Sequence, residues 1–271
     1  MNRFVVLLCV PGKVDRAFYK ALLIKIFRDK EDTTLEDLDA SERRTDKDNI
    51  LSAIFNAMPG SPIKKSAVLK LEKKKSNKEV YIIILPAEQK VTDLAKNVLF
   101  YQINSDEPTI DLIVIVEDWE NLGPIERITA LKNAIASLDN IRFKDSKSEK
   151  GEYFEYYRLD LPNSIGILLI AQGLSNSVPG LNIPCKHAIE DLIMSLFSDD
   201  MKRISKEHPK LLEKICKNKV VHKKLVSLLM IDKCCVDINI LLFKHSQKCM
   251  YEDLIKKHDG IKRLIDILEK L

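Results

Sequence analysis

The sequence predicts an α/β protein built on a mostly parallel, Rossmann-like sheet that is flanked by helices. Residues 4–10 (FVVLLCV) are consecutive apolar residues with the length and composition of a strand buried on both faces. Residues 112–116 (LIVIV) repeat that pattern, and a helical pattern follows each of the two runs. From Lys186 onward, apolar residues recur at helical spacing almost throughout. We therefore expect an α/β core over residues 1–175 and a helical C-terminal part over 176–271 packed on it.

The first strand leads into a tight turn and an amphipathic helix. Pro11 and Gly12 break the strand, and charged residues lie mostly on the face opposite the apolar one. The apolar positions at helical spacing are Val14, Ala17, Phe18, Ala21 and Leu22. Ligands of such sheets usually bind where the carboxyl end of a strand meets the next helix, so residues 11–15 are the first candidate site. Free backbone N–H groups at the helix start favour an anion at Gly12.

The next part of the chain predicts an exposed connection and a β-hairpin. Residues 29–48 are dense in charge without a strong apolar period, which indicates an exposed connection or a short helix. The runs 67–71 and 80–85 are rich in β-branched residues, and a polar turn joins them. We expect this hairpin, over residues 64–85, to be an insertion into the sheet.

Lysines crowd the rim of the predicted hairpin, and almost no acidic residue opposes them. Such a rim is either a solvated loop or a surface that contacts the phosphate backbone of a nucleic acid. The candidate contacts are Lys64, Lys65, Lys73, Lys74 and Lys75.

The remaining core elements follow from apolar periodicity and from helix breakers. Residues 91–101 predict a helix. Gly123 and Pro124 open another, since proline is well tolerated at the first helical position. Residues 152–159 and 165–171 predict two more strands.

The first turn resembles the opening motif of the Toprim domain. That motif is glutamate-glycine-lysine-x-aspartate at the end of a strand, followed by an amphipathic helix. Here Gly12, Lys13 and Asp15 match in order, and Pro11 stands at the glutamate position. The family occurs in topoisomerases, primases, overcoming-lysogenization-defect nucleases and standalone relatives. The resemblance implies catalytic roles for Lys13 and Asp15, and the loss of the acid/base that the glutamate supplies in the family.

Acidic residues follow the second buried strand, where the Toprim family has an aspartate-x-aspartate motif that holds Mg²⁺. The resemblance makes Asp118 and Glu120 the metal ligands, because carboxylate oxygens suit Mg²⁺ and alternate residues can reach one ion. In another register, Glu117 takes the first position and Trp119 the second. These residues are equally consistent with the start of a solvent-facing loop. Glu117 and Asp15 are also the candidates for a relocated catalytic acid/base.

Two downstream segments resemble later parts of the nuclease branch of the family. In residues 187–193, a glutamate near a helix start corresponds to a further metal ligand, which here is Glu190 or, alternatively, Asp191. A plain acidic residue on a helix surface is the other interpretation of Glu190. In residues 222–229, the resemblance implies a helix with a lysine facing the site. The candidates there are Lys223 and Lys224.

Composition limits the partners and the compartment. A net charge of +4 is too small to require a polyanionic partner, and no apolar run approaches the roughly 20 residues of a membrane span. Scattered cysteines indicate reduced thiols of a cytoplasmic protein. No zinc is expected, because Cys234 and Cys235 are adjacent, which makes them poor co-ligands, and the chain has no CxxC pair. The resemblance implies Mg²⁺ as the one candidate cofactor.

Three functions remain open at this point. The first is a degenerate Toprim-like protein that binds nucleic acid, DNA or RNA, or a protein partner without catalysis, as Pro11 favours. The second is a metal-dependent nuclease or phosphotransferase whose acid/base has moved. The third is an interaction scaffold that binds no nucleic acid, since one fold hosts unrelated functions.

Overall fold

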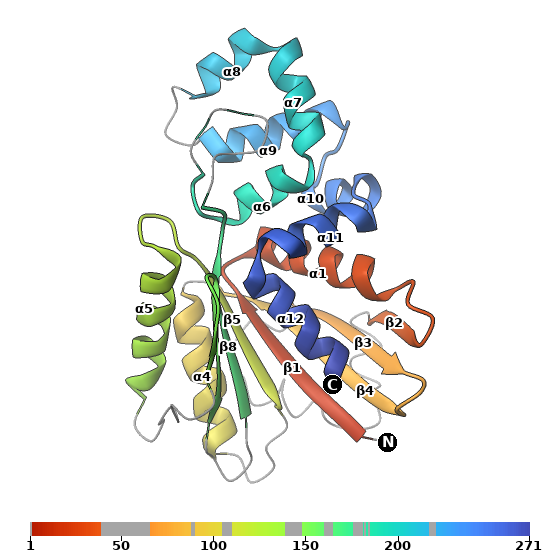
Figure 1. The fold of residues 1–271 in the computed structure, drawn as a ribbon, viewed down its shortest axis with the longest axis vertical. Coiled ribbons are helices and arrows are strands. Elements are labelled where there is room, and N and C mark those ends of the chain that lie inside the picture. Colours follow the sequence, from red (N-terminus) through yellow and green to blue (C-terminus); the bar gives the residue numbers. More distant parts are fainter. Residues whose placement is uncertain are drawn as a thin grey trace.

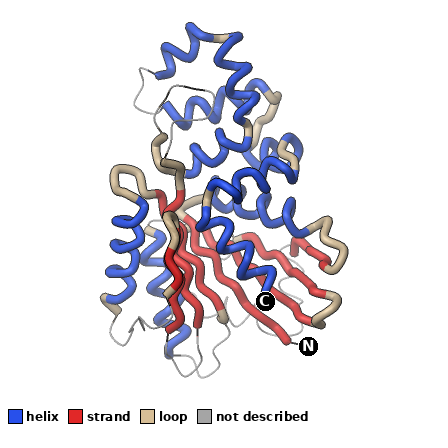
Figure 2. Tube along the Cα trace, viewed as in Figure 1, coloured by secondary structure: helices blue, strands red, loops and turns tan. Residues whose placement is uncertain are grey.

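In a computed structural model, the described residues of the protein form one eight-stranded mixed sheet with helices on both faces (Figures 1 and 2). The described residues are 2–38, 66–87, 90–104, 110–138, 148–159, 165–175, 181, 183, 185–216 and 221–271. The strands, in chain order, are β1 (Asn2–Val10), β2 (Thr33–Leu38), β3 (Ala67–Lys73), β4 (Lys78–Pro86), β5 (Leu112–Asp118), β6 (Glu149–Lys150), β7 (Phe154–Leu159) and β8 (Ile165–Gln172). Their order across the sheet is β2-β3-β4-β1-β5-β8-β7-β6. The strands predicted at 4–10, 112–116 and 165–171 are therefore confirmed.

The expectation of a mostly parallel sheet is wrong. Within the described strands, pairing is parallel only among the central four, β4, β1, β5 and β8. The flanking pairs are all antiparallel. The reason lies in the short connections, because β4 begins five residues after β3 ends, and β8 begins six residues after β7 ends. Connections of that length join antiparallel neighbours, whereas parallel ones need a crossover of a dozen residues or more.

The hairpin predicted at 64–85 exists, but it is not an insertion. Its second strand, β4, pairs in parallel with β1 over the whole length of that strand, and it is buried from Glu79 to Pro86. The charged segment predicted as a connection or short helix contains a strand, β2, which pairs with β3 at the edge of the sheet. Its half-exposed side chains (TTLEDL) explain why apolar periodicity did not reveal it. Lys64 and Lys65 lie outside the described residues.

Helices cover the two faces of the sheet with side chains from alternate strand positions. The helices are α1 (Lys13–Phe27), α4 (Val91–Asn104), α5 (Pro124–Ala136), α6 (Ile189–Leu196), α7 (Ser198–Glu207), α8 (Pro209–Cys216), α9 (Val221–Asp232), α10 (Ile238–Ile240), the π-helix η3 (Leu241–His245), α11 (Lys248–Lys257) and α12 (Asp259–Lys270). Val6 and Leu8 of β1 join the core beneath α1, whereas Val5 and Leu7 join the core beneath α4 and α5. This alternation follows from the two-residue period of a strand.

The C-terminal helices contribute to the same core as the sheet. α12 lies against β8 and β7, and α11 packs on α1 (Figure 1). Leu264 and Leu268 of α12 are buried in the cluster that also holds Leu168 and Ile170 of β8. None of the described helices combines the length and the apolar character that a bilayer crossing needs.

Candidate functional site

Polar side chains meet at the carboxyl edge of the central strands. β1, β5 and β8 run in parallel, so their carboxyl ends lie at one edge of the sheet. Asp15 stands in the first turn of the helix that follows β1. Asp118 and Gln172 are the last residues of β5 and β8, and they face each other in the register of the two strands. The site therefore forms where open α/β sheets usually bind ligands.

Gln172 connects the two aspartates. Its Nε2 atom donates to Asp15 Oδ1 at 2.6 Å and to Asp118 Oδ1 at 2.7 Å. The same Asp118 oxygen accepts the backbone N–H of Ile189, at the start of α6, at 3.2 Å. Asp15 is 5% exposed and Gln172 is 0% exposed, so the hydrogen bond between them is shielded from water, whereas Asp118 is only partly buried.

Glu190 adds a third acidic side chain from the first turn of α6, where it is buried. Its negative charge helps to raise the pKa values of both Asp15 and Asp118. Within the described part of the chain, no lysine or arginine forms an ion pair with Asp15, Asp118 or Glu190. We call these three residues the carboxylate cluster.

Burial makes the ionised form of this cluster unfavourable. It raises the pKa of Asp15 to about 6, against the opposing hydrogen bond from Gln172. It also raises the pKa of Asp118 to about 7, and the charge of Asp15 adds to that effect. A positive ligand would relieve the desolvation and the mutual repulsion together.

Two buried oxygen atoms at the cluster have no hydrogen-bond partner among the described residues. One is Oε1 of Gln172, and the other is the hydroxyl of Tyr19, one helical turn after Asp15. Burial raises the pKa of Tyr19, and the charges of Asp15 and Asp118 raise it further. Carboxylate and amide oxygens are ligands that Mg²⁺ and Ca²⁺ accept, so the donor set fits a hard divalent cation.

The cluster is not arranged around a common centre as it stands. Among the described residues, no three His, Cys, Asp or Glu side chains are disposed to hold a metal ion. The amide of Gln172 lies between Asp15 and Asp118 instead. A cation can bridge the two aspartates only if that amide moves.

Asp191, the alternative ligand, has a structural role at the start of α6. Its carboxylate is fully buried and accepts the backbone N–H groups of Lys186, His187 and Ala188 at 3.2, 2.5 and 3.1 Å. His222 of α9 places Nε2 3.7 Å from Asp191 Oδ1. These contacts hold the loop that presents the Ile189 N–H and the Glu190 side chain to the cluster.

Stacking of the Trp119 and His187 rings also supports this loop. Trp119 is 6% exposed and stacks on His187, with ring centroids 3.7 Å apart and an interplanar angle of 19°. Gly173, directly after Gln172, has a φ of +137°, and a Cβ there would lie 2.5 Å from the carbonyl carbon of His187. Only glycine fits that conformation and that close approach. Trp119 is thus a packing residue between the two strand ends.

Several predicted site residues lie outside the cluster. Glu117 points to the opposite face of the sheet from Asp118, because neighbouring strand residues alternate; Arg127 and Lys90 are its cationic neighbours. Lys13 is exposed. Glu120 is exposed and approaches Lys186 at 3.6 Å. Gly12 caps α1 in extended conformation without a side-chain partner.

The predicted lysines lie away from the carboxylate cluster. The turn that carries Lys73, Lys74 and Lys75 adjoins the amino end of β4, whose first residue pairs with Asn2. That turn is therefore separated from the cluster by the length of β1, about 30 Å for nine residues. Lys223 and Lys224 are exposed on α9, and it is His222 of that helix that approaches α6.

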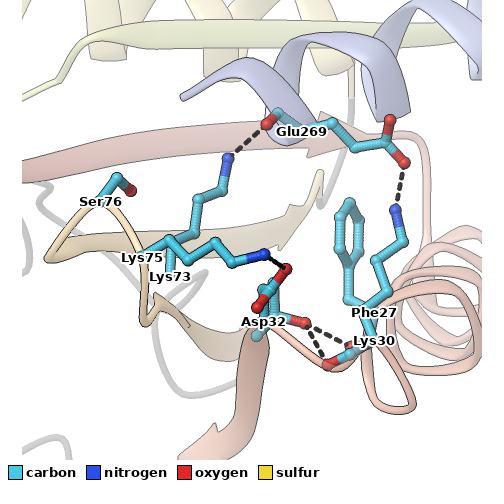
Figure 3. A pocket seen from close by; sticks show the side chains of 8 residues that line it. Phe27, Lys30, Asp32, Lys73, Lys75, Ser76 and Glu269 are labelled. Atoms are coloured by element: carbon cyan, nitrogen blue, oxygen red, sulfur yellow. Dashed lines mark hydrogen bonds and ion pairs between the residues drawn. The ribbon is translucent and has the colours of Figure 1, made fainter.

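Two of the turn lysines are engaged within the chain (Figure 3). Lys73 donates to the backbone carbonyl of Glu269 at 2.7 Å, and Lys75 pairs with Asp32 at 2.5 Å. Lys30 binds the Glu269 carboxylate. These residues line a cavity of about 280 Å³ and join the hairpin to the end of α12. Lys74 is exposed and has no ionic partner among the described residues.

Gln172 and Tyr19 were missed by the sequence analysis. For Gln172 a signal existed, because it is the polar residue that ends an apolar run, as Asp118 nearly does in β5. For Tyr19 the spacing of four residues from Asp15 places the two on one helix face. Neither signal distinguishes a site residue from an ordinary buried polar residue.

Comparisons with known proteins do not assign this site. No protein-family model matches the chain, and no curated protein sequence matches it significantly. Among solved structures, the chain is similar to a glyoxalase family protein from Bacillus cereus, with 7% identity over 62% of this chain and 91% of that chain. The TM-score is 0.19, which is too low to support an argument about fold or function.

Proposed function

We propose that this chain is a Toprim-like protein in which Asp15, Asp118 and Glu190 hold a divalent cation, Mg²⁺ in the cell, and that it binds a nucleic-acid phosphate without cleaving it. The observation that carries the proposal is the carboxylate cluster, gathered at the carboxyl edge of the sheet, in which Asp15 and Glu190 are buried and no member forms an ion pair with a lysine or arginine among the described residues. A bound cation would neutralise these groups and offer its free coordination positions to a phosphate oxygen.

We infer the absence of catalysis from the lack of a general acid/base at Pro11 and from the position of Glu117. A general acid/base contributes about 10² to 10⁴ in rate, and Pro11 has no proton to transfer. Glu117, one candidate replacement, is on the other face of the sheet. Nucleic acid as the bound partner rests on the Toprim resemblance, with the exposed Lys223 and Lys224 as candidate phosphate contacts.

A metal-dependent nuclease or phosphotransferase is the second candidate, and one observation favours it. The pKa of Asp15 is raised by burial to about 6, close to the range in which a carboxyl group serves as a general acid/base. Asp15 would then replace the missing glutamate in proton transfer, and Asp118 and Glu190 would remain as ligands.

Calorimetric titration with Mg²⁺ and Mn²⁺ tests the cation site. We expect the wild type to take up about one ion at low millimolar Mg²⁺, as Mg²⁺ sites of this kind are usually weak without a phosphate. The Asp15→Asn, Asp118→Asn double variant should take up none. The matched control is Glu117→Gln, Glu120→Gln, which removes the same charge from neighbouring positions outside the cluster and should retain binding. A wild type that binds neither metal contradicts the proposal.

Fluorescence anisotropy with labelled single-stranded and duplex oligonucleotides, DNA and RNA, tests the partner. Binding should strengthen in Mg²⁺ relative to EDTA, and gels of the same samples should show intact oligonucleotide. Mg²⁺-dependent cleavage that is lost in Asp15→Asn would support the nuclease instead. Cation uptake without any oligonucleotide binding would leave the cation site standing and remove nucleic acid from the proposal.

A further inference from the structure

The amide of Gln172 occupies the position that a cation shared by Asp15 and Asp118 would need. We propose that Gln172 closes the carboxylate cluster when no cation is bound and becomes an oxygen ligand when one is bound. This inference rests on the proposed function, because it assigns a role toward the same cation. It adds a residue that neither the Toprim resemblance nor the sequence pattern assigns.

The hydrogen bonds of Gln172 are unevenly satisfied. A glutamine amide has two N–H donors and one carbonyl acceptor. Both donors are used, at 2.6 Å to Asp15 and at 2.7 Å to Asp118. The carbonyl oxygen is buried and has no partner among the described residues. A buried acceptor without a hydrogen bond is unfavourable, so this arrangement destabilises the carbonyl oxygen of Gln172.

Rotation of the amide exchanges the two ends of the group. The terminal torsion of glutamine is broad and roughly two-fold, so a half-turn needs no change in the backbone. It would direct Oε1 toward the aspartates, where three oxygen atoms repel one another unless a cation lies between them. A cation therefore binds only one of the two orientations, and that difference in affinity selects it.

The backbone of Gln172 is held in place by its neighbours. Gln172 pairs with Asp118 in the register of β8 and β5, and its carbonyl accepts the N–H of Trp119 at 3.4 Å. Gly173 then turns the chain with a φ of +137°. The side chain can thus change orientation while its Cα remains between the two aspartates, which is what a ligand on a rigid strand requires.

Two substitutions of Gln172 separate ligation from simple closure. Gln172→Met keeps the length of the side chain but can neither donate to the carboxylates nor ligate a hard cation. Gln172→Glu keeps the oxygen ligand and removes the donor. The matched control is Gln102→Met, at a glutamine that is equally buried (3% exposed) but lies near the C-terminal end of α4. α4 follows β4 and runs back along the sheet, so that end of the helix is at the opposite edge (Figure 1).

The readouts are Mg²⁺ calorimetry and thermal unfolding in EDTA and in Mg²⁺. We expect Gln172→Met to weaken cation binding by about ten-fold or more, with a smaller rise in Tm on adding Mg²⁺. Gln172→Glu should lower the Tm in EDTA, because a fourth carboxylate joins the cluster, and give a larger Mg²⁺-induced rise than the wild type. Gln102→Met should leave the Mg²⁺-induced rise unchanged.

Three outcomes would overturn the inference. If Gln172→Met binds Mg²⁺ as tightly as the wild type or more tightly, Gln172 only blocks the site. The same holds if Gln172→Glu shows no larger Mg²⁺-induced rise in Tm, which keeps the test decisive should Gln172→Met fail to fold. The third outcome is a wild type that binds no cation, which removes the proposed function together with the inference. If the Asp15→Asn, Asp118→Asn variant loses cation binding while Gln172→Met keeps it, only the inference is removed.

Discussion

At the scale of single residues, this protein keeps carboxyl groups where their ionisation is unfavourable. Asp15 is buried and Asp118 is partly buried, and the two are linked through Gln172 close to Glu190. Groups with strongly raised pKa values cluster at functional sites more often than elsewhere. Gln172 donates hydrogen bonds to both aspartates, and the Ile189 N–H donates a further one to Asp118.

The pH dependence of stability follows from the raised pKa of Asp118. Its pKa is about 7 in the folded protein and 3.8 ordinarily, so the folded state holds the proton more tightly than the unfolded state. The resulting stabilisation is fully present below about pH 4 and is lost as the pH rises through about 7. Asp118→Asn in EDTA should therefore raise the free energy of unfolding at pH 8 by about 1 to 3 kcal/mol.

Urea unfolding at pH 5 and pH 8 checks this expectation. The advantage of Asp118→Asn over the wild type should be markedly smaller at pH 5, where the folded wild type already carries the proton. Asp199→Asn, at a side chain 93% exposed, is the control and should change stability by less than about 0.5 kcal/mol at either pH. An advantage of equal size at both pH values would contradict the raised pKa as its cause.

At the scale of elements, the start of α6 supplies the part of the candidate site that does not come from a strand end, namely the Ile189 N–H and the Glu190 side chain. A single carboxylate, Asp191, accepts hydrogen bonds from three consecutive N–H groups before the helix. Trp119 and Gly173 allow His187 to approach the strand ends closely. The helix therefore reaches the cluster through a loop that one side chain holds together.

Removing that side chain should cost stability and displace the site. We expect Asp191→Ala to lower the free energy of unfolding by about 2 to 4 kcal/mol, because it leaves three N–H groups, one buried and two partly buried, without acceptors. Mg²⁺ affinity should fall as well, since Glu190 and the Ile189 N–H lose their position. Urea unfolding and calorimetry measure the two effects.

Asp199→Ala is the comparison for this helix start, as Asp199 lies in the first turn of α7 with an exposed side chain. It should change neither quantity appreciably. If Asp191→Ala lowered stability and left Mg²⁺ affinity intact, the loop would not be what positions Glu190.

At the scale of the whole molecule, the C-terminal helices complete the core that the sheet begins. α1, α6, α11 and α12 share one face of the sheet, and the buried side chains of α12 lie in the same cluster as those of β8. The ties between the hairpin and Glu269 close the sheet's outer strands onto α12 (Figure 3).

A fragment of residues 1–175 should not fold on its own. Without α12, the apolar side chains of β7 and β8 beneath that helix would be exposed to water, and an uncovered apolar sheet face is unfavourable. Circular dichroism and urea titration of the fragment should show no cooperative transition, in contrast to the full chain. A cooperative transition would mean that the helical part is a separate folding unit. In the full chain, Leu264→Ala should cost about 2 to 4 kcal/mol.

The sequence by itself determined the local elements and the residues that end them. Apolar runs at 4–10, 112–116 and 165–171 are strands because such runs are stable only when buried on both faces. Breakers such as Pro11 and Gly123 mark where helices begin after them. The local pattern singled out residues 11–15, with Asp15 among them, and the Toprim resemblance added Asp118 and Glu190 as site residues.

Only the tertiary structure decided how the strands are ordered and which polar groups meet. β4 is a central strand beside β1, and Gln172 reaches Asp15 across 157 positions of the chain. Lys73, predicted as a phosphate contact, bonds instead to Glu269, 196 positions away. Strand order and such contacts depend on which buried faces pack together, and a pattern within one segment contains no information about a partner so distant. The local sequence thus specified where the strands end, and the packing of the sheet brought the carboxyl ends of β1, β5 and β8 together at the candidate site.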